Sequence, residues 1–452
     1  MSSPAPVQGS PGGRPLLTVE EARDQVLAAI PGPTPAETVP LQDALWRVAA
    51  ATVTARNTLP PWDNSAMDGY ALRAADVAGA SEDHPIRLTV VGEAAAGRAA
   101  TAAVAPGTAV RIATGAPVPA GADAVIPVEL TTPVDAAGGL GSRGRDATGS
   151  VPTAVLVHEA VPVGGSIREA GSDLLAGSVI LEGGSVLTPA AIALVAGAGH
   201  GTVSVHRRPR LAVLATGDEV RAPGEPLGIA GIPDANGPGL CAYVRAAGGE
   251  AIDLGIAPDQ LPVVIERLEA GLAAGADALL VAGGVSVGPY DVVKGAFETI
   301  GHVDLWKVSV QPGKPFAFGL VRATEGQAAP LLFGLPGNPV SSAVTFELFV
   351  RPAIRRLLGH RDLVRPLDRG VLREPVAKSA GRRAFLRVVV ERDAAGSPVR
   401  DSRGRVGVAL AGGQGSHVLT AMAAADALAI IPETSDRLPA GAEVNLWWLD
   451  QA

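Results

Sequence analysis

Apolar residues recur at helical spacing where the ordered chain is expected to begin. Residues 19–30 place Val, Ala and Ile on one face of a helix. Thr18 can cap this helix, because Glu21 follows three positions later and can bond back to the cap. A second stretch, 41–50, repeats apolar residues in a similar way. Residues 1–15 are rich in Pro, Gly and Ser and are expected to form a disordered leader.

The pattern changes to short apolar runs between about residues 51 and 150. Gly, Pro and Asp separate runs such as 86–91, 109–112 and 124–128, which is typical of short strands joined by turns. The region ends in a Gly-rich stretch, 138–150, expected to be a flexible loop. A small β-rich module is therefore predicted here.

Longer elements follow. Thr188-Pro189 has the form of a capped helix start with proline in the first turn. Between residues 209 and 358, near-continuous apolar strands alternate with helical segments, which predicts a parallel sheet covered by helices on both faces. The segment 362–452 returns to short strand-like runs and predicts a small β domain. The strands of the alternating region are expected at 211–215, 251–255, 278–282, 305–310, 316–321 and 331–334.

Composition limits the class of protein. A chain of 452 residues is too long for one core and should form about three or four domains. Hydrophobic residues make up 47%, and Gly (56) and Pro (38) together stay below the share typical of low-complexity chains, so global disorder is excluded. No apolar run reaches the roughly 18 residues that cross a bilayer. The N-terminus lacks the pattern of a signal peptide.

Charge and cysteine content exclude further classes. The net charge of -8 argues against nucleic-acid binding, which needs a basic surface. Cys241 is the only cysteine, which excludes an internal disulfide and a cysteine-based zinc site. The seven His residues lack the spacing of a metal-binding pair. We expect a cytoplasmic protein with no membrane or nucleic-acid partner.

Candidate chemistry lies in the loops that follow the strands of the alternating region, where open α/β sheets bind ligands. The loops 216–219, 311–315 and 334–339 are expected at one edge with the loop after strand 278–282. Glycines in that last loop allow backbone N–H groups to form an anion-binding turn, although a tight turn without a ligand explains them equally well. Its four small residues are Gly283, Gly284, Ser286 and Gly288. Asn338, in the 334–339 loop, is explained equally well as a helix cap.

Lysines and carboxylates sharpen this prediction. Only four of the 37 basic residues are Lys, and a compact ammonium charge suits a phosphate or another oxyanion. Asp218, Glu219 and Asp291 fall in the same loops and suit Mg²⁺ bound to phosphate oxygens, with solvated loop carboxylates as the alternative. The lysines of this region are Lys294, Lys307 and Lys314. A separate polar cluster, 64–71 with 114–124, is typical of turns, with a functional role for Asp68 as the alternative.

Taken together, these segments resemble the molybdopterin molybdenumtransferase family, which includes MoeA and the gephyrin E domain. Each segment is modest alone, but their order and spacing from residue 64 to 417 are specific. The segments are NSAMDGYA, TGAPVPAGADAV, TGDE, GGVSVG with Asp291, QPGKPFAFG, GLPGNPVS and GGQGSH.

The resemblance implies a multidomain fold of class α/β plus β in an elongated homodimer. Its parts are a disordered leader (1–15), an extended linker domain (16–50 and 151–190), an inserted β-rich module (51–150), a three-layer α/β molybdopterin-binding domain (191–361) and a C-terminal β-barrel (362–452).

The implied reaction inserts molybdenum from molybdate into adenylylated molybdopterin, cleaves the pyrophosphate bond and releases AMP. Mg²⁺ is the implied cofactor, with Glu219, Asp259 and Asp291 as its ligands. Catalytic roles fall by resemblance to Asp68, Thr114, Glu219 and Asp291, and Asp173 contributes near the domain junction. The residues implied to bind phosphate, pterin or molybdate are Gly283, Gly284, Ser286, Gly288, Lys307, Lys314, Pro336, Asn338, Arg383, Arg387 and Ser416.

One departure and two alternatives remain. Many relatives carry Lys where this chain has Gln311, so phosphate attraction should be weaker there. The alternatives are a molybdopterin adenylyltransferase-like activity, which shares the α/β domain, and a non-catalytic cofactor-binding scaffold. The NSAMDGYA module and the C-terminal domain argue against the first, and the carboxylates Asp68, Glu219 and Asp291 argue against the second. The implied partners are a molybdopterin adenylyltransferase and recipient molybdoenzymes.

Overall fold

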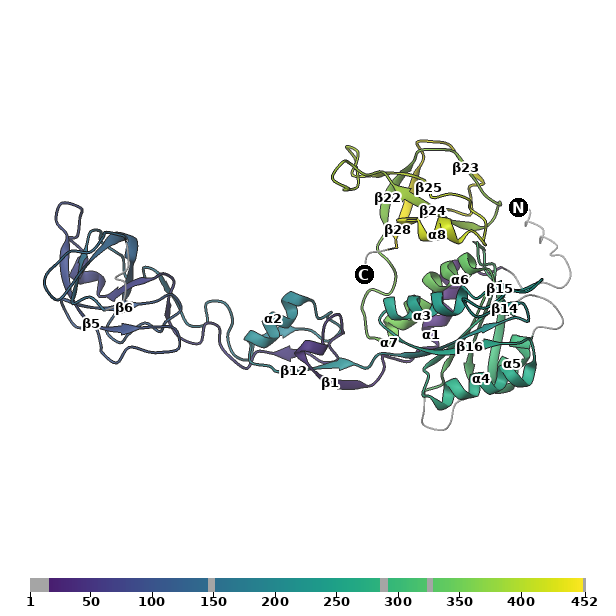
Figure 1. The fold of residues 1–452 in the computed structure, drawn as a ribbon, viewed down its shortest axis with the longest axis horizontal. Helices are drawn as coiled ribbons and strands as arrows, with labels where there is room; N and C mark the ends of the chain where they lie inside the picture. Colours follow the sequence, from purple (N-terminus) through teal and green to yellow (C-terminus); the bar gives the residue numbers. More distant parts are fainter. Residues whose placement is uncertain (1–15, 145–150, 285–291, 323–327, 450–452) are drawn as a thin grey trace, which may run out of the picture.

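The structure is a computed structural model that describes residues 16–144, 151–284, 292–322 and 328–449. Figure 1 shows an elongated molecule with the inserted module at one end, a small linker domain in the middle, and the α/β domain with the C-terminal barrel at the other end. No helix within the described ranges is long and apolar enough to cross a bilayer. The multidomain architecture expected from the sequence is confirmed.

The α/β domain is built on a six-stranded sheet of mixed direction. The four strands at one side run parallel, but β20 is antiparallel to both its neighbours, so the expectation of a wholly parallel sheet is wrong at that side. The reason is local: no crossover helix separates β18 from β20, and short connections produce antiparallel pairs. The order is β16 (Glu250–Ala257), β13 (Arg210–Thr216), β17 (Ala278–Ala282), β21 (Leu331–Leu335), β20 (Pro315–Val321) and β18 (Gly301–Lys307).

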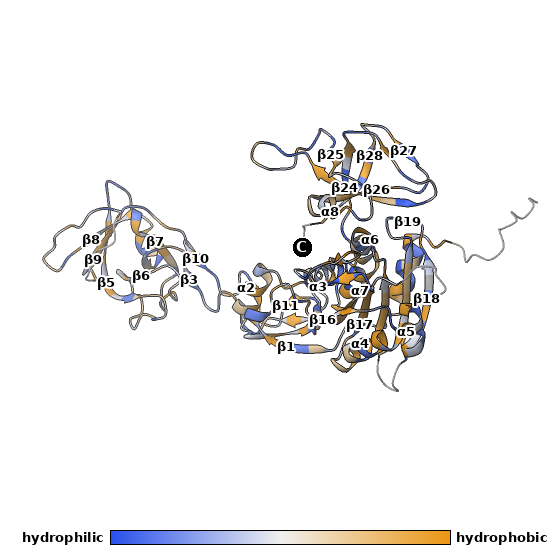
Figure 2. Ribbon diagram, turned by 45° about the vertical axis from the view of Figure 1, so that its right-hand side comes forward, coloured by the Kyte–Doolittle hydropathy of each residue, from blue (hydrophilic) through white to orange (hydrophobic). Residues whose placement is uncertain are grey.

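Helices cover both faces of this sheet and form the expected three layers. One hydrophobic cluster joins the sheet to α4 (Leu261–Ala273) and α5 (Val292–Ile300), and a second joins the opposite face to α3 (Asn236–Ala246) and the long helical segment 339–357. Figure 2 shows hydrophobic residues concentrated in the strands between these layers. The helical segment consists of α6 (Pro339–Thr345), a π-helical turn η4 (Phe346–Val350) and α7 (Arg351–Leu357).

The first helix, α1 (Val19–Ala28), has the predicted cap, since the Thr18 hydroxyl accepts from the Glu21 N–H at 3.1 Å. Its buried face packs against α7 and η4, so this helix is part of the α/β core, although the resemblance implied that residues 16–50 belong to the linker domain. The predicted amphipathic stretch at 41–50 is a single 3₁₀ turn, η1 (Leu41–Asp43). A helix cannot continue through it, because Trp46 has a φ of 61°.

The linker domain connects to the α/β domain through two adjacent strands. β1 (Ala36–Pro40) runs antiparallel to β12 (Thr202–His206), with Ala36 opposite His206. Beside this pair the Thr34 hydroxyl donates to the carbonyl of Arg207 at 2.5 Å, so the outgoing and returning chains meet. The domain also contains α2 (Pro189–Gly197), which is capped by Thr188 as predicted, and the pair β2 (Val53–Thr54) and β11 (Val179–Leu181).

The inserted module is a six-stranded sheet with a hydrophobic cluster on each side. β9 pairs with both β5 and β8, which places 154–157 in this module, beyond the boundary expected at residue 150. A short pair, β3 (Asn64–Ser65) and β10 (Ile167–Arg168), leads back to the linker domain. The strands of the sheet are β7 (Ala124–Pro127), β4 (Gly69–Leu72), β6 (Thr108–Ile112), β5 (Ile86–Ala94), β9 (Ala154–Val157) and β8 (Thr131–Val134).

The C-terminal domain is a closed barrel, as expected, because β24 pairs with both β25 and β26 and so completes the ring. Its interior is a separate hydrophobic cluster, and the short helix α8 (Leu419–Ala423) packs beside β24. One strand comes from the α/β domain: β19 (Val310–Gln311) lies parallel to the start of β24. The barrel strands are β22 (Asp368–Leu372), β24 (Arg383–Val390), β25 (Val406–Leu410), β26 (Ala427–Ile431) and β28 (Glu443–Trp448).

Candidate functional site at the sheet edge

The strand register confirms that the predicted loops meet along one edge of the α/β sheet, which we call the rim. Neighbouring strands end level with one another across the sheet, and this aligns the loops after β16, β13, β17 and β21 with the β18–β20 connection. The paired residues that show this are Thr216 with Ala257, Ala215 with Ala282, Ala282 with Leu335, Gly334 with Ala317, and Lys307 with Pro315.

Two glycines of the loop after β17 are required by its geometry. Gly283 and Gly284 have φ values of 103° and 60°. A Cβ on Gly283 would lie 2.7 Å from the carbonyl oxygen of Thr216, and one on Gly284 would lie 2.4 Å from a methyl carbon of Val293. The Gly283 N–H donates to the carbonyl of Leu335 at 3.1 Å, which ties this loop to the next strand. Ser286, Gly288 and Asp291 lie outside the described residues.

Two of the three predicted lysines stand at the rim. Lys307 ends β18, Lys314 immediately precedes β20, and both side chains are exposed. Within the described ranges neither ammonium is paired with a carboxylate. Lys294 instead lies on α5, with its Nζ 3.6 Å from Glu298 on the same helix. The rim therefore presents two positive charges available to an anionic ligand.

Acidic groups lie at the opposite end of the same edge, after β13 and β16. The backbone N–H of Asp259 donates to the carboxylate of Asp218 at 3.1 Å. Burial, together with the charges of Asp218 and Glu219, raises the pKa of Asp259. No group of three or more His, Cys, Asp or Glu residues in the described part of the chain is arranged to hold a metal ion.

The loop after β21 is held from two sides. The Pro336 carbonyl accepts a hydrogen bond from the Ser342 hydroxyl, and the Gly337 carbonyl accepts one from Asn236 Nδ2 at 2.7 Å. Asn338 takes the N-cap position of α6, but its side chain makes no capping hydrogen bond and is exposed. Its amide is thus available at the rim, and the cap alternative loses support.

Asn236 was not singled out from the sequence, although a recognisable signal precedes it. It opens α3, and the Asp234 carboxylate accepts a hydrogen bond from the Gly237 N–H at 2.9 Å in the same turn. An Asp-x-Asn-Gly turn before an apolar helix is a helix-start pattern, which identifies the turn. It does not show that the asparagine amide reaches a loop about a hundred positions away, at Gly337.

The barrel approaches the rim through the loop 412–417. The Ser416 carbonyl accepts a hydrogen bond from the Val340 N–H at 3.1 Å, at the start of α6. Arg387 is fully buried beneath the loop, where its guanidinium donates to the carbonyls of Gly413 (3.4 Å) and Gly415 (3.2 Å). Burial lowers the pKa of Arg387, and its Nε has no hydrogen-bond partner.

Arg383 has a different environment. Its guanidinium bonds Glu20 of α1, and its Nε lies 3.1 Å from Glu433 of the barrel. The charge of Arg383 is therefore already matched by two carboxylates, and this side chain joins the barrel to the α/β domain.

Asp68, the predicted catalytic carboxylate of the inserted module, lies away from the rim of its own chain. Asp68 Oδ1 accepts hydrogen bonds from the Thr114 N–H at 2.7 Å and from the Thr114 hydroxyl at 2.9 Å, so the structure brings these two predicted residues together. The linker domain separates their module from the α/β domain (Figure 1). Asp173 is exposed, and its backbone N–H donates to the carbonyl of Leu59.

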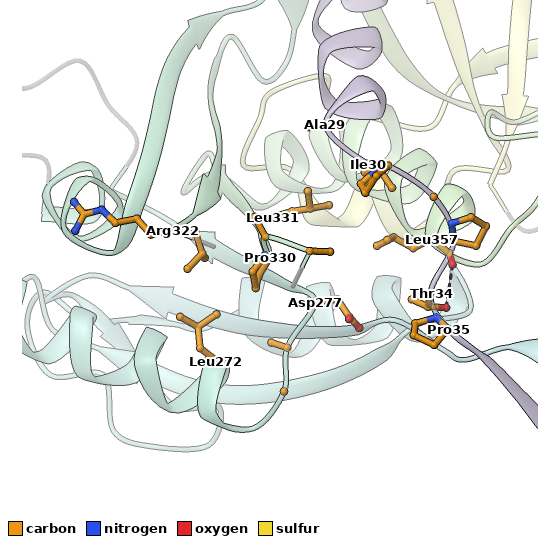
Figure 3. A pocket seen from close by; sticks show the side chains of 18 residues that line it. Ala29, Ile30, Thr34, Pro35, Leu272, Asp277, Arg322, Pro330, Leu331 and Leu357 are labelled. Atoms are coloured by element: carbon orange, nitrogen blue, oxygen red, sulfur yellow. Dashed lines mark hydrogen bonds between the residues drawn. The ribbon is translucent and has the colours of Figure 1, made fainter. Parts of the chain in front are cut away.

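A cavity of about 520 Å³ opens at the opposite edge of the sheet, beside the exit of the chain toward the linker domain (Figure 3). Its walls are mostly apolar, from Leu272, Val321, Pro330 and Leu357. Its carboxylate, Asp277, is satisfied by both terminal nitrogens of Arg207, at 2.7 and 3.0 Å. No unpaired charged group among the described residues that line this cavity points to a ligand, whereas glycines, lysines and acids converge at the rim.

Comparisons with known proteins agree with this architecture. Residues 17–199 match the family described as MoeA N-terminal region (domain I and II), residues 212–356 match a probable molybdopterin binding domain, and residues 369–449 match the MoeA C-terminal region (domain IV). The three matches follow the linker with its module, the α/β domain and the barrel. They define a protein of the molybdopterin-binding α/β class with the accessory domains of MoeA.

Individual relatives are similar over nearly the whole chain. Molybdopterin molybdenumtransferase 2 of Mycobacterium tuberculosis is 37% identical over 91% of this chain and 94% of its own length, and the Haemophilus influenzae molybdopterin molybdenumtransferase is 33% identical over 95% and 98%. The solved molybdopterin biosynthesis MoeA protein of Pyrococcus horikoshii has a TM-score of 0.74 at 30% identity, over 96% of this chain and 99% of that one. The chain belongs to the molybdopterin molybdenumtransferase (MoeA) family.

Proposed function

We propose that this protein is a molybdopterin molybdenumtransferase that acts in molybdenum cofactor biosynthesis. Its substrates would be adenylylated molybdopterin and molybdate, and its products the molybdenum cofactor and AMP. The observation that carries the proposal is the rim, where two exposed lysines, a glycine turn and a group of carboxylates lie in a row on a chain of this family.

The lysines and glycines suit the pyrophosphate of the substrate. Lys307 and Lys314 follow one another around the β18–β20 connection, so their ammonium groups supply positive charge at one end of the rim. Gly283 and Gly284 allow the backbone to approach a ligand where a Cβ would collide with the protein. Asn338, with its uncommitted amide, adds a neutral donor between the two.

The carboxylates suit a hard divalent cation. Mg²⁺ prefers one or two carboxylates together with phosphate oxygens and water, and Glu219 and Asp259 provide the carboxylates. The raised pKa of Asp259 fits this role, because neighbouring like charges that disfavour its ionised form would be relieved by a cation. Asp291 is the third proposed ligand. The bound cation would neutralise phosphate charge.

Molybdate suits the loop 412–417. Arg387 places a buried positive charge beneath this loop without a carboxylate partner in the described residues, and such a charge favours an oxyanion nearby. Ser416 would add a hydroxyl from the same loop. Arg383, which two carboxylates already neutralise, would hold the barrel in position and does not need to touch the substrate.

We further propose that the active form is a homodimer in the cytoplasm. Asp68 and Thr114 lie too far along the elongated chain to reach its own rim, so their proposed catalytic role requires a second copy whose inserted module completes the site (Figure 1). A molybdopterin adenylyltransferase would supply the substrate, and a molybdoenzyme would receive the product.

The deciding experiment is to incubate the purified chain with adenylylated molybdopterin, molybdate and Mg²⁺ and to measure AMP. We expect AMP release that depends on molybdate and falls at least a hundredfold, on the order of 3 kcal/mol, in Lys314→Ala. The matched control is Lys378→Ala, a lysine of the barrel whose Nζ already donates to the carbonyls of Ser379 at 3.3 Å and Arg382 at 2.6 Å. AMP release that ignores molybdate, or equal loss in both variants, would contradict the proposal.

A further inference from the structure

A second basic region lies where the α/β domain passes into the barrel. An open cavity of about 860 Å³ is formed by α7, the connection 361–367 and the end of β28. Four guanidinium groups line it: Arg351, Arg355, Arg361 and Arg365. A smaller cavity of about 290 Å³, bordered by α3 and α8, shares Arg351 and Arg365. We call the two together the junction cavity.

The arginines outnumber the acids around them. Arg365 binds Glu347 through two hydrogen bonds, at 2.7 and 3.2 Å, so this carboxylate is already engaged. Arg351 Nε lies 3.8 Å from the same carboxylate, which is too long for a hydrogen bond. Arg351 is nevertheless only 8% exposed and lines both parts of the cavity.

The remaining two arginines use neutral partners. Arg355 Nε donates to the carbonyl of Asp362 at 2.7 Å, and the Arg361 guanidinium donates to the carbonyl of Gly183 in the linker domain at 2.9 Å. Carbonyls satisfy donors but do not neutralise charge. Among the described residues that line the two cavities the acids are Glu347 and Asp362, so four positive charges face two negative ones there.

The pKa values of two nearby groups are lowered, first by burial and then by neighbouring arginines. Burial, followed by the charge of Arg365, lowers the pKa of Arg351 to about 10. Burial, followed by Arg355 and Arg351, lowers the pKa of His360 to about 4. Both groups thus lie in a region where a further positive charge is unfavourable and a negative charge would be stabilised.

We propose that the junction cavity binds a tetrahedral oxyanion with two negative charges, held by Arg351, Arg355 and Arg361. Phosphate, sulfate and molybdate share this chemistry, and guanidinium groups match it through paired N–H donors. A bound oxyanion would connect α7 to the segment that leads into the barrel. Since Arg361 also contacts the linker domain, the linker domain, the α/β domain and the segment that leads into the barrel would meet at this ligand.

The site is distinct from the rim. Arg351 lies twelve positions beyond Pro339 in one helical segment, or about 18 Å along its axis, and Pro339 marks the rim end. The proposal therefore does not depend on the reaction assigned to the rim, and a test can separate the two.

The test is calorimetric titration of the full-length protein with inorganic phosphate, sulfate or molybdate, at constant ionic strength. Arg355→Gln and Arg361→Gln are the principal variants, because their side chains are not fully buried and their loss should leave the fold intact. Arg351→Gln is added with circular dichroism as a check of folding. Arg369→Gln, an exposed barrel arginine that lies 3.9 Å from Glu443, is the matched control.

We expect one oxyanion per chain at the junction, separate from any bound at the rim, with a Kd at least tenfold weaker in the three junction variants and unchanged in Arg369→Gln. Lys314→Gln, which alters the rim, should retain this binding, and the tightest of the three anions identifies the natural source. The proposal is overturned if wild type binds none of them at millimolar concentration, if Lys314→Gln removes all binding, or if Arg355→Gln and Arg361→Gln bind like wild type.

Discussion

The side-chain oxygen of Gln311 accepts a hydrogen bond from the backbone N–H of Ser379, at 3.1 Å. The two residues belong to different domains: Gln311 is in β19, between the rim lysines, and Ser379 is in the barrel. This glutamine, at a position where the family resemblance led us to expect lysine, therefore attaches the barrel beside the rim. The charge missing at the rim and the bond gained between domains are two effects of one side chain.

Gln311→Lys should tighten binding of an anionic substrate and make binding more sensitive to salt. A third ammonium between Lys307 and Lys314 adds on the order of 1 kcal/mol at partial exposure, or about fivefold in Kd. Gln311→Met is the control, since it removes the Ser379 hydrogen bond without adding charge. Titration with adenylylated molybdopterin at two salt concentrations measures the effect. Equal affinities in wild type and Gln311→Lys at low salt would show that position 311 does not face the ligand.

Gly283→Ala should distort the rim both by backbone strain and by a steric clash with Thr216. The added Cβ would lie 2.7 Å from the Thr216 carbonyl in a backbone with φ of 103°. Gly404→Ala is the matched control, because Gly404 also has a positive φ (75°) but nothing within 4 Å of an added Cβ. The control should lose roughly 1 kcal/mol of unfolding free energy and keep its activity. Gly283→Ala should lose more stability and most AMP release; similar behaviour of both variants would refute the close approach.

As the pH falls, the affinity for a divalent cation should begin to decrease at a higher pH than it would at a site of aspartates with ordinary pKa values. The pKa of Asp259 is raised by burial and by Asp218 and Glu219, so its proton competes with the cation already above the usual aspartate range. Mg²⁺ affinity, followed by calorimetry across acid to neutral pH, should therefore rise as Asp259 ionises. In Asp259→Asn the affinity should be low and this part of the pH dependence absent. An identical pH profile in the variant would exclude Asp259 as a ligand.

Asp368 should contribute to barrel stability down to strongly acidic pH. A bidentate bond from Arg400 is the largest of the effects that lower its pKa to about 2. Because the folded pKa is lower than the unfolded value, the stabilisation is present above about pH 4 and disappears as the pH falls toward 2. The difference in thermal midpoint between wild type and Asp368→Asn should shrink over this interval. A difference that stays constant from pH 5 to pH 2 would contradict the assignment.

Mixed dimers test whether two chains share one site. If the Asp68 of one chain serves the rim of its partner, Asp68→Ala and Lys314→Ala homodimers should both be inactive. In a mixed dimer one site carries both changes and the other carries neither. Random exchange makes about half of the dimers mixed, so roughly a quarter of the sites should recover. Refolding the two tagged variants together and measuring AMP provides the test; no recovered activity in verified mixed dimers would reject the shared site.

Local sequence patterns predicted helices and strands well where a single local effect, such as complete burial or helix capping, decides the structure. Strand 278–282 is observed with the predicted bounds because all five of its residues are buried, and the Thr188-Pro189 start works because the cap and the proline act within one turn. Prediction failed where a distant partner decides the outcome. Helix α1 has an ordinary amphipathic face, and nothing in its sequence shows that this face packs on α7 rather than on nearby strands.

The site shows the same division. The rim could be predicted because strand ends in an open sheet collect at one edge, which places Lys307, Lys314 and Glu219 along the same edge by topology. The environment of each side chain could not. That Arg387 is fully buried under a barrel loop while Arg383 joins two carboxylates depends on how the barrel is seated, and both are plain arginines of one strand.

The chain leaves the α/β domain and returns to it at adjacent positions, so the linker domain and inserted module could be inserted or removed as one segment. Ala36 pairs with His206, and the Arg207 N–H donates to the Pro35 carbonyl at 2.9 Å. Residues 36–206 therefore form an insertion whose two ends are in contact. A gene in which a short glycine turn replaces residues 36–206 would still encode every strand of the α/β sheet and of the barrel. Such an arm can be gained, exchanged or lost in one recombination event without removing a strand of the α/β sheet or of the barrel.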